Sequence, residues 1–164
     1  MEKRLRAACA LFAEDDVLQR FEEVQIARYL PGERFLWHED AVPPPLLAQD
    51  GSDGGQRVAT LLVYLSGDGD ASKGGATCFR DLGDPPPLRV LPQKGDAILF
   101  FPSRRVRPHD GPFQPDDRTV HAGEPSTGPK IEKWVSQLWL HDRPFPPAIL
   151  QNNDRPASLL ADPS

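Results

Sequence analysis

The spacing of apolar side chains predicts a helix at the start of the chain and strands after it. Between residues 3 and 21 apolar positions recur at roughly helical intervals, which indicates one helix, or two short ones, covering one side of a core. These positions are Leu5, Cys9, Phe12, Val17 and Phe21. From Glu22 onward the pattern becomes that of strands, with proline- and glycine-rich corners between the segments.

The predicted strands are short, and one of them is apolar on both alternations. That segment, residues 57–66 (RVATLLVYLS), predicts a central strand covered on both faces. The other expected strands cover residues 24–29, 35–40, 74–80, 88–91, 96–102, 118–122 and 133–141, with loops at 41–55 and 103–118. Eight or so short strands after an N-terminal helix predict a mainly β fold, a double-sheet jelly roll with the helix packed on one sheet.

Length and composition are those of one globular domain. The chain has 164 residues, of which 38% are hydrophobic and 26% charged. We expect a single domain over residues 1–164, with helical support at 3–21, a jelly-roll core at 22–143 and a tail at 144–164. A net charge of −5 creates no global positive field, so we expect no nucleic-acid partner.

Other classes of protein are disfavoured by what the chain contains. No apolar run approaches the roughly 20 residues of a membrane helix, so we expect no membrane partner. Cys9 and Cys78 are too few for a disulfide framework, and we expect both to be reduced and buried. The first residues lack a convincing secretion signal, which favours a cytoplasmic location.

Three polar side chains could form a metal site. His38 and Asp40 lie two apart on an extended segment, so both side chains are expected on one face. His121, at the start of another short strand, is the best third ligand, with His109 and His141 as alternatives. Two histidines and one carboxylate that leave three positions open form the facial triad of non-haem Fe(II) oxygenases. On its own, a His-x-Asp pair is also compatible with an ordinary surface pair.

Several motifs surround these residues in a fixed order along residues 22–143. They are EEVQIARYLPGERFLWHED, QRVATLLVYL, GGATCFRD, KGDAILFF, and DRTVHAGEP followed by KWVSQLWLHDR. Together they resemble the prolyl 4-hydroxylase-like family of Fe(II)/2-oxoglutarate dioxygenases. The resemblance implies the family's double-stranded β-helix, and it implies that His38, Asp40 and His121 are the catalytic iron ligands.

The resemblance also implies a binding site for the cosubstrate, 2-oxoglutarate. Lys133 matches the family lysine that binds the distal carboxylate of this molecule. Lys130 is the alternative, because the interval from His121 to Lys133 is two residues longer than the family usually has. Tyr29 and Thr77 match positions whose hydroxyls help to hold the cosubstrate.

The implied reaction is hydroxylation of a substrate C–H bond, with O2 and 2-oxoglutarate consumed and succinate and CO2 released. Ascorbate is a candidate reductant. Arg57 and Trp139 match positions that face the substrate in the family. The implied substrate is a prolyl residue in a peptide or protein, although Phe35 and Glu124 replace a frequent tyrosine and a frequent cysteine near the pocket. The alternatives are a catalytically silent jelly-roll binding module and a zinc hydrolase built on the same three ligands. The oligomeric state is open.

Overall fold

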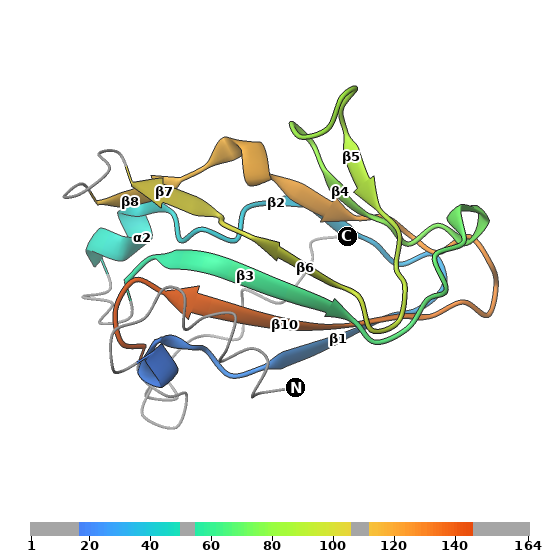
Figure 1. Cartoon of the computed structure of the whole chain (residues 1–164), viewed down its shortest axis with the longest axis horizontal. Coiled ribbons are helices and arrows are strands. Elements are labelled where there is room, and N and C mark those ends of the chain that lie inside the picture. Colours follow the sequence, from blue (N-terminus) through green and yellow to red (C-terminus); the bar gives the residue numbers. More distant parts are fainter. Residues whose placement is uncertain (1–16, 50–54, 106–111, 146–164) are drawn as a thin grey trace.

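Two antiparallel β-sheets, layered one above the other in Figure 1, form the body of this computed structural model. The structure describes residues 17–49, 55–105 and 112–145. Across the first sheet, the order is β1 (Gln25–Tyr29), β10 (Lys133–His141), β3 (Arg57–Tyr64) and β6 (Ala97–Phe100). Across the second sheet, it is β2 (Phe35–His38), β9 (His121–Gly123), β4 (Thr77–Phe79) and β5 (Leu88–Val90). The mainly β jelly roll predicted from the sequence is confirmed.

The long strands follow the hydrophobic pattern closely. β10 has the predicted bounds. β3 lies between β10 and β6 and ends at Tyr64, two residues earlier than predicted. Thr60, Leu62 and Tyr64 on one face are buried, whereas Leu61 and Val63 on the other are half-buried, so the strand is less covered on that face than predicted. β2 is shorter than predicted, because it ends at His38 and Asp40 lies beyond it in a bend. The reason is that the carboxylate and the backbone carbonyl of Asp40 are bonded to side chains of β3 rather than continuing the ladder with β9.

The segments predicted as loops contain short elements. Residues 41–55 include a helix, α2 (Pro44–Gln49), which begins at a proline whose missing N–H has no partner to lose there. Residues 103–118 include a hairpin of β7 (Ser103–Arg105) and β8 (Phe113–Pro115). The expected strand at 118–122 is instead a 3-10 turn, η4 (Asp117–Thr119), which Asp116 caps, followed by β9.

The remaining short elements lie near the chain start and in the loop before β4. They are the 3-10 turns η2 (Val17–Arg20) and η3 (Ala71–Lys73). Of the predicted helix at 3–21, residues 3–16 lie outside the described residues, and 17–20 form the turn η2. No helix among the described residues is long and apolar enough to cross a membrane.

The core fills the space between the two sheets. Leu62 and Tyr64 alternate onto the inner face of β3 and pack with Val135 of β10. Contacts between side chains then join the sheets: among them, Phe79 meets Phe100 edge to face at 5.2 Å between ring centroids, and the Tyr64 hydroxyl lies 2.8 Å from Thr77 Oγ1. The inner face of the first sheet is therefore fixed against the strands that carry the candidate ligands.

Cys78 is a buried free thiol, as predicted. Burial, together with a hydrogen bond to Glu124, raises the pKa of Cys78 to about 11, so the thiol is protonated and unreactive at neutral pH. Cys9 lies outside the described residues.

Candidate metal centre and cosubstrate pocket

His38, Asp40 and His121 converge at the inner edge of the second sheet. His38 ends β2 and is paired directly with His121, the first residue of β9. Their ring centroids are 4.1 Å apart, and one ligand atom from each of the three residues lies within 4.8 Å of the others. Asp40 and His121 are buried and His38 is partly exposed, so the cluster opens on one side.

The hydrogen bonds of the two histidines leave the metal-binding nitrogens free. His38 Nδ1 lies 2.8 Å from the Leu36 carbonyl, and His121 Nδ1 lies 3.0 Å from the Thr119 carbonyl. A carbonyl only accepts, so each Nδ1 carries a proton, and the neutral imidazole of this tautomer presents its lone pair at Nε2. Such a bond is the usual way in which proteins orient a metal-ligating histidine.

The free nitrogens point at one carboxylate oxygen. Asp40 Oδ1 lies 3.7 Å from His38 Nε2 and 3.9 Å from His121 Nε2, which is too long for hydrogen bonds. The other oxygen, Oδ2, accepts a 2.7 Å hydrogen bond from the Thr60 hydroxyl. Burial lowers the pKa of His121 and favours the neutral imidazole that binds metals. Two neutral imidazoles and one carboxylate fit a divalent ion such as Fe(II).

Lys133 carries a buried ammonium group, which the Glu124 carboxylate attracts without forming an ion pair. The residue is 5% exposed, and in the described part of the chain its Nζ has neither a hydrogen bond nor an ion pair. Nζ lies 5.6 Å from the ring centroid of Tyr29, its cross-strand partner, and 5.8 Å from that of Tyr64. Burial lowers the pKa of Lys133 to about 8. A cation in such a place calls for an anionic ligand.

Lys133 lies beside β9, the strand that begins at His121. A Cβ added to Gly123 would come 3.7 Å from Lys133 Nζ, so the glycine keeps the space beside Lys133 open. Gly123 and His121 are two residues apart on β9, which places them on the same face and about 7 Å apart. Thr77 lies opposite Gly123 on β4, and its hydroxyl lies 2.8 Å from the Tyr64 hydroxyl, which is also 3.2 Å from the Val90 carbonyl. A short dicarboxylate could therefore reach from Lys133 to the metal centre.

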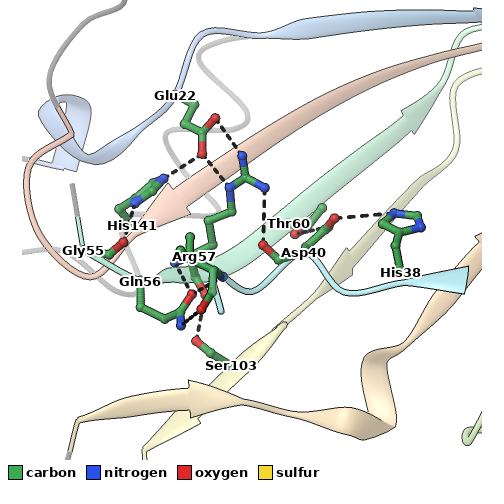
Figure 2. Close-up of polar contacts among 10 residues, drawn as sticks. Glu22, His38, Asp40, Gly55, Gln56, Arg57, Thr60, Ser103 and His141 are labelled. Carbon is green, nitrogen blue, oxygen red and sulfur yellow. Dashed lines mark hydrogen bonds and ion pairs between the residues drawn. The ribbon is translucent and has the colours of Figure 1, made fainter. Parts of the chain in front are cut away.

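Arg57 and Trp139 lie together at the opposite end of β3 and β10. The Arg57 guanidinium stacks over the Trp139 ring at 4.0 Å. Figure 2 shows that Arg57 is engaged by Glu22 and by the Asp40 carbonyl. Trp139 Nε1 is buried and has no hydrogen-bond partner among the described residues. An indole N–H in that state can donate to a bound molecule.

The alternative residues from the sequence lie elsewhere. His141 is bonded to Glu22 (Figure 2). It is not part of the cluster of His38, Asp40 and His121. Lys130 is exposed, whereas Lys133 is buried. His109 lies outside the described residues.

Comparison with known proteins identifies the family to which this chain belongs. A family model described as the 2OG-Fe(II) oxygenase superfamily matches residues 24–141. The chain belongs to this superfamily. Within the 2OG-Fe(II) oxygenases it is prolyl 4-hydroxylase-like: Prolyl 4-hydroxylase 1 of Arabidopsis thaliana is 33% identical in an alignment of 153 positions that covers 87% of this chain and 47% of that protein. Prolyl 4-hydroxylase 5 of the same plant is 33% identical over 139 residues, 76% of this chain and 43% of that protein.

Solved structures place this 2OG-Fe(II) oxygenase chain in the same group. The viral collagen prolyl hydroxylase of Paramecium bursaria Chlorella virus-1, solved as a 2-oxoglutarate complex, is 30% identical with a TM-score of 0.64. The match covers 85% of this chain and 69% of the viral one. A Pseudomonas putida prolyl-4-hydroxylase is 19% identical with a TM-score of 0.53 and shows the shared fold. The chain spans less than half the length of the plant relatives.

Two side chains at the candidate site were not singled out in the sequence. The Thr60 hydroxyl donates a hydrogen bond to the Asp40 carboxylate. The Tyr64 hydroxyl is hydrogen-bonded to Thr77, and the Tyr64 ring lies beside Lys133 Nζ. Both side chains lie on the same face of β3, an otherwise largely apolar strand. Polar groups on a buried face signal a site, and the two-residue period would have revealed them.

We expect the affinity of the metal-loaded protein for 2-oxoglutarate to fall as the pH rises through about 8. Because the pKa of Lys133 is about 8 in the free protein, the ammonium that would meet the distal carboxylate is lost above that pH. The dissociation constant should then rise up to about tenfold per pH unit. Titration with 2-oxoglutarate between pH about 7 and about 10 measures this. In Lys133→Arg the guanidinium stays charged, so its affinity should be independent of pH in this window. A flat wild-type profile would contradict the role of Lys133.

Proposed function

We propose that this chain is an Fe(II)- and 2-oxoglutarate-dependent dioxygenase that hydroxylates a prolyl residue in a peptide or protein. The observation that carries the proposal is the convergence of His38 Nε2, Asp40 Oδ1 and His121 Nε2, with both imidazoles held in the metal-binding tautomer. Membership of the superfamily and the prolyl hydroxylase relatives support the same chemistry.

Different residues of this chain would bind the iron, the cosubstrate and the substrate. His38, Asp40 and His121 hold the iron on one side of the cluster. Iron and 2-oxoglutarate, when bound, supply the oxidising power by which one oxygen atom of O2 enters the substrate C–H bond and the other enters succinate, with release of CO2.

The cosubstrate would be held at its far end by groups from both sheets. Lys133 pairs with the distal carboxylate, while the hydroxyls of Thr77 and Tyr29 donate to it. The buried side chains of Leu62, Tyr64 and Val135 line the inner sheet face and exclude water. Trp139 and Arg57, at the other end of the same strands, would face the substrate.

The decisive experiment is formation of succinate from 2-oxoglutarate by Fe(II)-loaded protein, with ascorbate present, with and without a proline-rich peptide. We expect iron-dependent succinate that the peptide stimulates, and a peptide mass increased by one oxygen. Succinate without oxygen on the peptide would leave the dioxygenase and overturn the prolyl assignment. Zinc-loaded protein should form no succinate if the chain is a dioxygenase. Hydrolytic activity of the zinc-loaded protein would instead support the zinc hydrolase. Failure to bind either iron or 2-oxoglutarate would favour a silent binding module.

A further inference from the structure

A partly buried ionic cluster lies next to the candidate metal centre without belonging to it. At its middle is Glu22, whose side chain is 10% exposed. Glu22 Oε1 is 2.6 Å from Arg57 Nε and 2.7 Å from His141 Nε2, and Oε2 is 3.1 Å from Arg57 Nη2 (Figure 2). One carboxylate thus joins side chains that are 35 and 119 positions away in sequence.

The electrostatics show that this carboxylate is well compensated. Burial works to raise the pKa of Glu22, but the hydrogen bonds from His141 and Arg57 outweigh it and hold the pKa below its usual value. Glu22 is therefore charged at neutral pH, and the fork of Arg57 is fixed by two parallel bonds.

The Arg57 guanidinium also contacts the main chain of Asp40, one of the three candidate metal ligands. Its Nη1 donates to the backbone carbonyl of Asp40 at 3.3 Å, and its flat face lies on Trp139. The backbone of Arg57 is anchored separately, because the Ser103 hydroxyl donates to its carbonyl at 2.7 Å. The Glu22 contacts therefore decide where the guanidinium lies, and the guanidinium holds the main chain of Asp40.

Asp40 needs such support because it lies beyond the end of β2. The bend that carries it is fixed at three points: Thr60 binds its carboxylate, Arg57 binds its carbonyl, and Gln56 pairs with the backbone of Val42. Of these supports, the one through Arg57 is the one that depends on Glu22.

We propose that Glu22 is a positioning residue for the metal centre, acting through Arg57 on the main chain of Asp40. The inference rests on the proposed role of Asp40 as a metal ligand. It assigns Glu22 a task that neither the triad nor the cosubstrate pocket gives it, and it makes Arg57 part of the support of the metal site.

The test is the affinity of the protein for Co²⁺, a redox-stable divalent probe, measured by calorimetry without any substrate. Glu22→Gln keeps the size of the side chain and removes the charge that holds the fork. We expect the dissociation constant for Co²⁺ to rise about tenfold. Removal of a group that hydrogen-bonds to a metal ligand lowers metal affinity by about 10- to 100-fold, and this expectation is the lower end of that range.

The matched control is Glu132→Gln. Glu132 makes the same two-bond pair with Arg28 on the exposed side of the first sheet, at 3.0 and 2.5 Å. This variant should bind Co²⁺ as the wild type does. Equal losses in both variants would show a general effect of charge and overturn the proposal.

A second variant covers the case in which Glu22→Gln does not fold. Arg57→Lys keeps a cation beside Glu22 but loses the fork that reaches the Asp40 carbonyl, and it should also weaken Co²⁺ binding about tenfold. If Glu22 acts through Arg57, the double variant should lose no more affinity than either single variant. Fully additive losses would contradict the route through Arg57.

His121→Ala separates failure of this inference from failure of the metal assignment. If His121→Ala loses Co²⁺ binding while folded Glu22→Gln and Arg57→Lys stay within about twofold of wild type, the metal site stands and the positioning role is wrong. If His121→Ala binds Co²⁺ as tightly as wild type, the metal assignment itself is wrong, and the role of Glu22 is wrong with it.

Discussion

Replacing Asp40 with asparagine, or His121 with alanine, should remove iron-dependent succinate formation. Each change deletes one of three convergent donors, and Asp40→Asn also places a neutral amide where two imidazoles face a carboxylate. Because loss of an outer partner of a metal ligand already lowers metal affinity about 10- to 100-fold, loss of a ligand should lower it further. Succinate release and calorimetric titration with Co²⁺ measure the two effects.

Asp117→Asn is the control for this pair of variants. Asp117 is an exposed carboxylate in the turn before His121, and the same chemical change there should leave both turnover and metal affinity as in the wild type. Iron-dependent turnover in Asp40→Asn at more than about a tenth of the wild-type rate would show that the carboxylate is not a ligand.

Lys133→Met should nearly abolish 2-oxoglutarate binding and, at the same time, stabilise the protein without ligands. Loss of one partner of a buried charge pair weakens binding by about 2–5 kcal/mol, about 30-fold or more in affinity. Titration of metal-loaded protein with 2-oxoglutarate measures this loss. Lys130→Met, at the exposed alternative lysine, should leave the affinity unchanged.

The gain in stability follows from the lowered pKa. Lys133 has a pKa of about 8 in the folded protein against an ordinary value of 10.5, so the unfolded chain binds more protons between these two pH values. The free energy of unfolding therefore rises with pH through this window, and below about 8 the full unfavourable contribution of the buried ammonium is present. At pH 7, removing it should stabilise the protein by up to about 3 kcal/mol.

Thermal unfolding without ligands tests this sign. We expect Lys133→Met to unfold at a higher temperature than the wild type, and 2-oxoglutarate to raise the unfolding temperature of the wild type alone. A less stable Lys133→Met would mean that the ammonium is satisfied in the free protein, which would remove the reason for its assignment.

The parts of the site that lie on regular strands could be predicted from the sequence. Lys133 begins a strand whose two bounds were both correct, and Tyr29 lies directly opposite it. His38 and His121 were placed on two short extended segments, and these segments pair with each other. In each case the position depends on a local two-residue period, which a sequence displays.

The placement of Asp40 could not be predicted in the same way. The sequence suggested that Asp40 shares a face with His38 on one strand, but the strand ends first and Asp40 is positioned by Thr60 and Arg57. These contacts, like that between Glu22 and His141, join distant segments that approach only once the sheets have formed. Hydropathy carries no information about which buried charges will meet.

The three candidate ligands are held by both sheets, and this affects how stable the folded chain is towards unfolding and proteolysis. His38 and His121 belong to one sheet, whereas Asp40 is bound to Thr60 of the other, so an ion at the three ligands would link both layers. A ligand that binds only the folded state adds stability by mass action, about 2.7 kcal/mol at a hundred times its dissociation constant. The supply of iron would then set the fraction of chains that is open to proteolysis, and a cell short of iron would lose the protein itself as well as its activity.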